Sequence, residues 1–405
     1  MKYAAGSGGS RHVVTVGLLA TGMLAFVTNA VVARLLSQSD FGAVGSILAL
    51  AALLAIPLGS VSSAVTRQVV VTSPGAIRVW KFVGGTALCA GLMILVFFAL
   101  VPLLDPLLHV SGNASVLLLG LYLGAILVES VPRGVLLGER RYLTVALLIP
   151  LGALAKLGLS AVWSALEPSV ASPLGGIALG EALTALSLLV GLRVLGNPGA
   201  RNQRLQISDV GLSIAGFTGL LSLMSVDTIA ARYFLTGAQS GDYAVASGLG
   251  SAAYFVAAAA STAIFPDLAS GVSAKERRSF VVGLAEVTAL ALVAAALLDL
   301  LAGPVIHIVY GGRYIGAKVP LMVLSLSYAL LGVLAYLVAH HLAHRSRAIA
   351  LSWVGAGVLA TAVILAHRSP TEIALDALIS SCILAAILIS VSVHLERPIG
   401  VRHEV

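Results

Sequence analysis

Charged side chains are scarce in this chain, because Lys, Arg, Asp and Glu together make up 10% of its 405 residues. A soluble domain carries about 25% charged residues, so the composition excludes a cytosolic globular enzyme. Cysteine is also rare. The two cysteines, Cys89 and Cys382, both fall inside apolar runs and indicate neither a disulfide framework nor a metal site. These deficits indicate a protein that lies in lipid.

Long apolar runs dominate the rest of the chain. Twelve runs of 19 to 25 residues can be marked, and each is close to the ~20 residues with which a helix crosses a bilayer. The predicted spans are 13–33, 41–64, 82–104, 115–138, 143–165, 170–192, 209–233, 243–266, 279–302, 319–341, 348–366 and 371–394. The connections are too short for a soluble domain. The sequence therefore predicts an all-α, multi-pass integral membrane protein with about twelve transmembrane helices.

Basic residues are segregated between the two sets of connections. With the N-terminus placed in the cytoplasm, seventeen of the 24 Lys and Arg residues lie on that side and four on the outer side, while Arg133, Lys156 and Arg232 lie within spans. Cytoplasmic loops near span ends are enriched in Lys and Arg, so both termini are predicted to be cytoplasmic. The net charge of +7 then has a topological cause, and no nucleic-acid partner is expected.

The two halves of the chain repeat a short pattern. Ala33-Arg34 ends the first span and Ala231-Arg232 ends the seventh, at an offset of 198 residues. The pairs Asp40-Phe41 and Asp242-Tyr243 follow, the second after a connection that reads as four residues longer. Internal repeats of this kind are common in transporters. The pattern predicts two parallel six-helix lobes, 1–195 and 209–405, joined by a cytoplasmic linker over 196–208.

Charges within the spans mark candidate functional residues, because a charged side chain at a helix centre is costly and usually faces a partner or a cavity. Lys156 and Glu181 lie near the middles of adjacent antiparallel spans, where they can form either a structural ion pair or part of a site. Glu129 and Arg133 are four residues apart on one helix face and can pair with each other. Arg133 is also near enough to its span end to reach the interface.

Two arginines occupy equivalent places in the repeat. Arg34 and Arg232 are each either an interfacial anchor or part of the outer mouth of a cleft between the lobes, with Arg133 and Lys156 deeper. Four cations along one route suit an anionic head group, since Arg binds phosphate in a bidentate way. The candidates for charge balance or for proton or ion coupling are the acidic residues Glu129, Glu181, Asp227 and Glu286.

Other motifs predict no cofactor, no metal and no ATPase activity. The stretch Gly311–Lys318, GGRYIGAK, lacks the Gly-Lys-Ser/Thr ending of a phosphate loop. His340, His341 and His344 lie at the end of the tenth span, where we expect them to be solvated rather than metal-bound. The four-residue glycine spacings Gly120/Gly124 and Gly176/Gly180 are typical of close helix packing.

Two stretches resemble the multidrug/oligosaccharidyl-lipid/polysaccharide flippase superfamily, and within it the polysaccharide biosynthesis flippases of O-antigen and lipid-linked oligosaccharides. They are 32–67, which contains ARLL followed by DFG, and 227–266, which contains DTIAARYF followed by GDYAVA. Together they cover about a fifth of the chain, and the twelve-span layout extends the resemblance over the rest.

The resemblance implies two six-helix bundles that form a V-shaped cationic cleft in the plasma (inner) membrane. It implies a flippase that moves a polyprenyl-diphosphate-linked glycan from the cytoplasmic to the outer leaflet by alternating access. Its expected partners are the lipid bilayer, that glycan lipid and other cell-envelope polysaccharide assembly proteins.

Three alternatives stay open. The first is a proton- or sodium-coupled exporter of organic cations from the same superfamily, which a carboxylate-rich cleft would favour. The second is a membrane-embedded glycan polymerase or glycosyltransferase, which would need positioned catalytic groups. The third is a non-transporting scaffold, in which substitutions of the cations would be silent.

Overall fold

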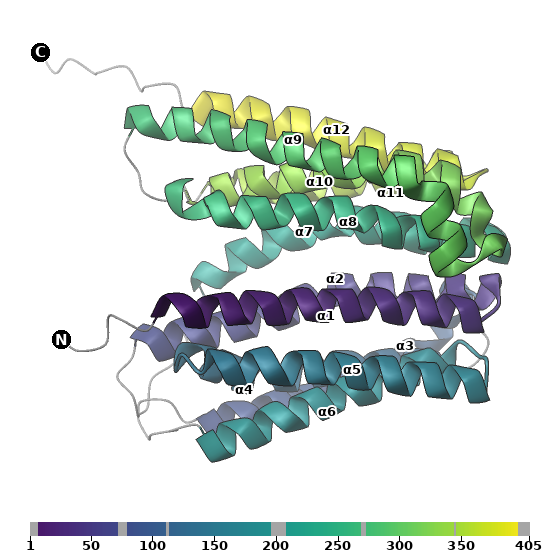
Figure 1. Ribbon diagram of the computed structural model, residues 1–405, viewed down its shortest axis with the longest axis horizontal. Coiled ribbons are helices and arrows are strands. Elements are labelled where there is room, and N and C mark those ends of the chain that lie inside the picture. Colours follow the sequence, from purple (N-terminus) through teal and green to yellow (C-terminus); the bar gives the residue numbers. More distant parts are fainter. Residues whose placement is uncertain are drawn as a thin grey trace, which may run out of the picture. The chain divides into compact units, whose positions relative to one another are not determined.

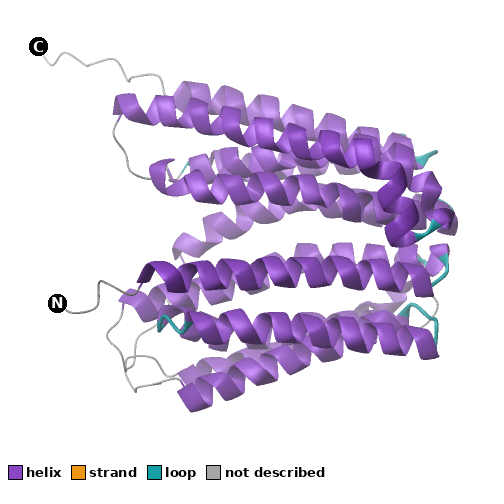
Figure 2. Cartoon of the chain, viewed as in Figure 1, coloured by secondary structure: helices purple, strands orange, loops and turns teal. Residues whose placement is uncertain are grey.

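The computed structural model of the chain describes residues 7–71, 79–110, 113–195, 208–268, 273–343 and 346–395. The described residues form helices joined by short connections, without a strand (Figure 2). Twelve of the described helical segments are long and apolar enough to cross a membrane. Each predicted span overlaps one of them, so the predicted fold class and the number of spans are confirmed.

The chain divides into two compact units, Met1–Val210 and Gly211–Val405. The predicted linker 196–208 lies outside the described residues except for its last one, Ser208, which begins α7.

Unit 1 is a bundle of six helices (Figure 1). They are α1 (Ser7–Leu35), α2 (Gln38–Val71), α3 (Val79–Leu108), α4 (Ala114–Gly138), α5 (Tyr142–Leu166) and α6 (Ala171–Leu195). The central helix is α4, which packs on α2, α3 and α6, while α5 packs between α6 and α1. In its apolar segment 61% of the residues are buried, against 22% in that of α3, because α4 has neighbours on several sides.

Unit 2 repeats this plan with additional short helices. It contains α7 (Ser208–Phe234), α8 (Gly237–Leu268), α9 (Ser273–Val305), the π-helical turn η1 (Ile306–Tyr310), the 3-10 helices η2 (Gly312–Ala317) and η3 (Arg347–Leu351), α10 (Lys318–Ala343), α11 (Ser352–Leu365) and α12 (Pro370–Leu395). Here α10 is central and packs on α8, α9 and α12, and 78% of the residues in its apolar segment are buried. Since α4 and α10 are the fourth helices of their units, the repeat seen in the sequence extends to the packing.

The turns that follow the repeated arginines are alike. Two residues separate α1 from α2, and two separate α7 from α8. The prediction of a longer second connection is therefore wrong, because the extra residues lie within the helices. Ser37 caps α2, with its Oγ accepting from the Asp40 N–H at 3.1 Å and donating to the Asp40 carboxylate at 2.7 Å.

A matching cap begins α8. Thr236 accepts from the Gln239 N–H at 3.4 Å, and the Gln239 amide oxygen accepts from the Thr236 N–H at 3.2 Å. Reciprocal contacts of this kind satisfy backbone donors that a helix start leaves without a partner. In both turns a hydroxyl therefore caps the next helix by accepting from the N–H three residues later.

Glycines set the closest helix contacts in unit 1, as predicted. Gly120 and Gly124 of α4 face Phe97 and Ala90 of α3, where an added Cβ would come within 2.9 Å and 3.3 Å of side-chain atoms. Gly176 and Gly180 of α6 lie directly against Ser160 and Lys156 of α5. Small residues let helix backbones approach closely in lipid, where the hydrophobic effect does not hold helices together.

Candidate functional site

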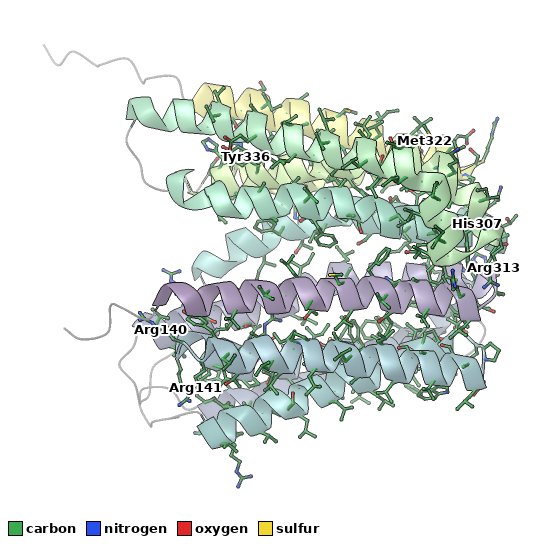
Figure 3. All side chains as sticks on the ribbon, viewed as in Figure 1. Arg140, Arg141, His307, Arg313, Met322 and Tyr336 are labelled. Carbon is green, nitrogen blue, oxygen red and sulfur yellow. The ribbon has the colours of Figure 1, made fainter. Side chains whose placement is uncertain are left out.

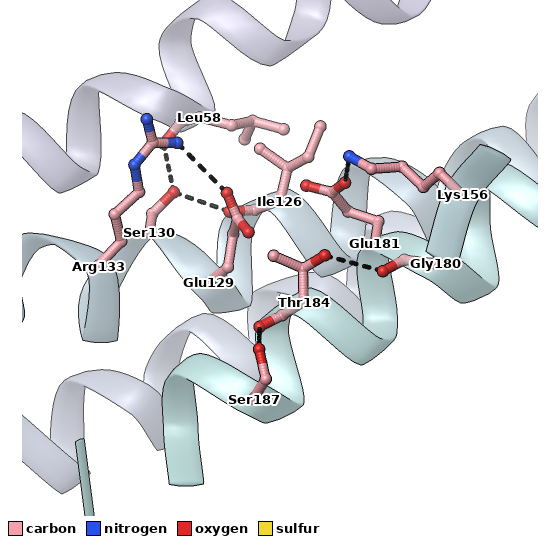
Figure 4. A network of polar contacts seen from close by, with 10 residues as sticks. All are labelled: Leu58, Ile126, Glu129, Ser130, Arg133, Lys156, Gly180, Glu181, Thr184 and Ser187. Carbon is pink, nitrogen blue, oxygen red and sulfur yellow. Dashed lines mark hydrogen bonds and ion pairs between the residues drawn. The ribbon is translucent and has the colours of Figure 1, made fainter. Parts of the chain in front are cut away.

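Lys156 and Glu181 form an ion pair between α5 and α6 (Figure 4). The stem of Lys156 crosses the backbone of Gly180, the residue before Glu181, so a side chain at Gly180 would collide with it. The exposed fraction is 22% for the Lys156 side chain and 6% for that of Glu181. The predicted pairing is therefore confirmed, and the glycine explains how two charged groups can meet between closely packed helices.

Glu129 and Arg133 form the second pair, one turn apart on α4. The Arg133 Nη1 lies 3.5 Å from the Glu129 Oε1. The Glu129 side chain is 8% exposed and that of Arg133 is 31% exposed. Ser130, beside them, donates to the carbonyl oxygen of Leu58 at 3.0 Å and so ties α4 to α2 (Figure 4). The predicted i,i+4 pair is present.

The two pairs belong to one group of charges, which we name the α4–α6 charge cluster: Glu129, Arg133, Lys156 and Glu181. The charge of Glu129 interacts with those of Glu181, Arg133 and Lys156. The hydroxyl of Tyr122, also on α4, interacts electrostatically with both carboxylates. The cluster holds two cations and two anions, and such balance reduces the cost of placing charge in a membrane interior.

Asp227 is the centre of a separate polar network in unit 2. Its carboxylate is fully buried and accepts from the hydroxyls of Tyr243 and Tyr328, each at 3.0 Å, and from the Thr228 N–H at 2.6 Å. Ser247 lies 2.8 Å from the Tyr328 hydroxyl and 3.0 Å from that of Thr228. The Thr228 hydroxyl also donates to the carboxylate, at 3.2 Å. This Asp227 network joins α7, α8 and α10, and four donors satisfy the carboxylate without a cation in direct contact among the contacts described.

The repeated arginines differ in their surroundings. Arg34 is exposed at the end of α1. Arg232 is only 7% exposed, and its Nη1 donates to the Ser240 hydroxyl of α8 at 3.2 Å. Glu286, the remaining predicted acidic residue, is exposed on α9. Of the eight residues selected from the sequence, the structure brings four together in unit 1, buries Asp227 and Arg232 in unit 2, and leaves Arg34 and Glu286 exposed.

The histidine prediction is wrong for the residues that the structure describes. His340 and His341 are 1% and 0% exposed rather than solvated, because they lie on the central helix α10. The His340 ring lies 4.3 Å from that of Phe280 on α9, and the His341 Nε2 lies 3.1 Å from the Ser392 hydroxyl of α12. His344 lies outside the described residues. Among the described residues, no group of three or more His, Cys, Asp or Glu side chains could hold a metal ion.

Several polar residues of the spans were not selected from the sequence. Tyr243 and Tyr328 complete the Asp227 network, and Tyr122 lies beside the α4–α6 charge cluster. Asp299 accepts from the Ser325 hydroxyl at 2.7 Å, which joins α9 to α10. The signal was available for Asp299, since a carboxylate inside an apolar span is rare. The tyrosines carry no such signal, because a tyrosine is common in spans and only packing shows its hydroxyl partner.

The basic connections lie outside these networks. Figure 3 shows Arg140 and Arg141 at the connection between α4 and α5, where the Arg141 Nε pairs with Glu139 at 3.2 Å. In unit 2, the same figure shows His307 and Arg313 at one end and Tyr336 toward the other. The stretch Gly311–Lys318, which was predicted not to be a phosphate loop, contains the 3-10 helix η2.

No family model and no curated protein matches the sequence. Solved structures do match. A lipid II flippase, MurJ, in an inward closed conformation superposes with a TM-score of 0.72 at 15% identity, over 94% of this chain and 87% of that one. An inward-facing multidrug resistance MATE family transporter of the MOP superfamily gives a TM-score of 0.66 at 15% identity, over 95% and 98%.

The chain shares the fold of these two membrane proteins. A mutant form of the Vibrio cholerae MATE transporter VcmN also shares this fold, with a TM-score of 0.62 at 14% identity over 96% of this chain and 95% of that one. The resemblance read from the sequence is thus confirmed at the level of the fold. A lipid II flippase and multidrug transporters share this helix layout, so the fold alone does not distinguish between these two kinds of protein.

Proposed function

We propose that this protein is a flippase that moves a polyprenyl-diphosphate-linked glycan from the cytoplasmic to the outer leaflet of the plasma (inner) membrane. A polar glycan cannot cross ~30 Å of hydrocarbon unaided, so the protein supplies a polar route while the lipid tail stays in the bilayer. Alternating access follows from movement of one repeat against the other, as in other transporters built from repeats. The MOP fold, which a lipid II flippase shares, supports a transporter role.

The observation that carries the proposal is the pair of partly exposed cations in the α4–α6 charge cluster. Arg133 and Lys156 lie within membrane-spanning segments, and their side chains are 31% and 22% exposed. Arg and Lys are the residues with which proteins bind phosphate. We assign both to the diphosphate, and we propose Arg34 and Arg232 as further contacts along the route.

The topology, the division into lobes, the roles of the acidic residues and the partners are also proposed. We place both termini and the linker 196–208 in the cytoplasm and divide the chain into lobes 1–195 and 209–405. We propose that Glu129, Glu181, Asp227 and Glu286 balance charge or couple transport to an ion, without a cofactor and without ATP hydrolysis. Other polysaccharide assembly proteins of the cell envelope are the expected partners.

The test is the leaflet location of polyprenyl-linked glycan in cells depleted of the protein. We expect the glycan lipid to build up in the cytoplasmic leaflet, where an impermeant enzyme or lectin added outside cannot reach it. The wild-type protein should relieve the build-up. A Lys156→Ala, Arg133→Ala double variant, expressed at the wild-type level, should not.

The control is Glu139→Gln, which removes a carboxylate paired with Arg141 outside the spans. It should rescue like the wild type. If the double variant relieves the build-up, Arg133 and Lys156 are not needed for transport. If depletion leaves the glycan distribution unchanged, the protein is not the proposed flippase.

A second candidate function is the coupled export of organic cations, and the Asp227 network favours it. A fully buried carboxylate on a membrane helix is suited to a proton or a monovalent cation, and multidrug transporters share the fold. Depletion should then change tolerance to lipophilic cations and leave the glycan distribution as it was. The same cells therefore distinguish the two functions.

A further inference from the structure

The two halves of the α4–α6 charge cluster differ in exposure. The carboxylates are the buried members, since the Glu129 and Glu181 side chains are 8% and 6% exposed, while those of Arg133 and Lys156 are 31% and 22% exposed. An anion that approaches the cluster meets the cations first. It competes with the carboxylates for them rather than binding to free cations.

The cations also have donors to spare. Among the contacts described, the Arg133 guanidinium makes one hydrogen bond, from Nη1 to Glu129 at 3.5 Å, at the long limit for such a bond. Its other N–H groups could form a bidentate contact with a phosphate. The Lys156 ammonium carries three donors, and Glu181 accepts one of them. Both cations can therefore turn from a carboxylate to a phosphate without a change of helix position.

We propose that the α4–α6 charge cluster is a charge-exchange site, in which a diphosphate diester takes Arg133 and Lys156 from Glu129 and Glu181, and each released carboxylate binds a proton. This inference rests on the proposed function. It adds that anion loading and proton uptake occur together in unit 1.

The exchange keeps the interior neutral. Before loading, two cations balance two carboxylates. After loading, the same cations balance the two negative charges of the diphosphate diester, and two protons from solvent neutralise the carboxylates. A buried carboxylate that loses its cation without gaining a proton would be an uncompensated charge, which proteins avoid by neutralising the group.

The groups that act on the carboxylates are few. Those described are Arg133 and Tyr122 on α4, Lys156 on α5, and the two glutamates themselves, on α4 and α6. From α2, the cluster is met by the Leu58 carbonyl through Ser130, a group that does not titrate. Proton uptake on loading is therefore assigned to Glu129 and Glu181.

The experiment measures proton uptake when an anion binds to the purified full-length protein in lipid nanodiscs. The probe is a short-chain prenyl diphosphate sugar, because both of its phosphates are diesters that do not titrate near neutral pH. Calorimetric titrations in two buffers of different ionisation enthalpy give the number of protons bound per ligand. We expect about two, and an affinity that rises about tenfold per unit fall in pH for each proton taken up.

Two double variants locate the protons and the anion. Glu129→Gln with Glu181→Gln mimics the protonated carboxylates, so it should bind the probe without proton uptake and with an affinity that no longer depends on pH. Arg133→Met with Lys156→Met should lose binding by tenfold or more. The control, Glu139→Gln, should keep the wild-type affinity and proton count.

The outcomes separate this inference from the function on which it rests. Tight binding by the wild type without proton uptake would overturn the exchange and leave the flippase standing. Unchanged proton uptake by the glutamine variant would also overturn it, because the protons would then bind elsewhere. Absence of binding, or binding indifferent to loss of the cations, would instead count against the basic site of the proposed function.

Discussion

At the scale of the residue, the neighbours of Lys156 determine how its charge can lie between two helices. Its stem crosses Gly180 and its ammonium group reaches Glu181, so α6 supplies both the space and the counter-charge. The sequence identified the residue as costly and paired it correctly, because adjacent antiparallel helices with charges at equal depth have few other partners. It did not indicate that Glu129 and Arg133 of α4 would join the same cluster.

Removal of one member of the Lys156–Glu181 pair should destabilise the protein. Lys156→Met leaves the buried Glu181 carboxylate without its cation, and we expect a loss of about 3–5 kcal/mol in unfolding free energy. Adding Glu181→Gln should recover much of it, because neither charge then remains. The measurement is thermal unfolding of the purified variants in detergent. Strictly additive losses in the double variant would show that the two side chains do not interact.

Asp227 should stabilise unit 2 because its carboxylate oxygens accept hydrogen bonds from buried donors. Asp227→Ala leaves the hydroxyls of Tyr243 and Tyr328 and the Thr228 N–H without their acceptor, at about 1–3 kcal/mol for each buried group. Asp227→Asn keeps a carbonyl oxygen and should cost less. Unfolding temperatures of both variants, with Tyr243→Phe as a single-bond reference, test this order. Equal losses for Ala and Asn would argue against the network.

At the scale of the element, the apolar runs predicted the helices, and the glycines predicted where two helices pack closely. Each predicted span became a helix because a chain in lipid must satisfy its backbone groups internally. Several helices run beyond the predicted ends, and α2 extends over Gln38–Val71 where 41–64 was predicted. Ends are harder to predict than spans, because capping contacts such as that of Ser37 and Asp40 decide them.

The contact between α5 and α6 should be sensitive to a methyl group. In Gly180→Ala the new Cβ would lie 2.8 Å from the Lys156 Cα, and such overpacking costs about 1–3 kcal/mol. Gly158→Ala is the matched control on α5, since a Cβ there meets nothing within 4 Å. It should be neutral or stabilising by about 0.5–1 kcal/mol. Thermal unfolding in detergent compares the two, and equal effects would contradict the packing argument.

At the scale of the whole molecule, the repeat is the main feature. The two units share the packing order around α4 and α10, and both place a capped two-residue turn after the repeated arginine. Their polar interiors are not alike, because unit 1 holds the α4–α6 charge cluster and unit 2 holds the Asp227 network. The same helix packing therefore surrounds an ion-pair cluster in unit 1 and a hydrogen-bonded carboxylate in unit 2.

The charge bias of the connections predicts the orientation of the whole chain. A reporter that works only in the cytoplasm should be active when it is fused after Val405, because the C-terminus is predicted to be cytoplasmic. In a variant with Cys89 and Cys382 replaced by alanine, Arg313→Cys should react with an impermeant maleimide from outside, while Arg140→Cys should react only after the membrane is opened. Labelling of both positions from the same side would refute the assigned topology.

The sequence by itself determined the class of the protein, the number of its spans and its internal repeat. Those properties follow from hydropathy and from short motifs, which are local along the chain. The histidines at 340 and 341 were misjudged, and the tyrosines around Asp227 were missed, because their burial depends on which helices surround α10. Partners of polar groups are set by contacts between residues distant in the chain, and only the packed bundle brings those residues together.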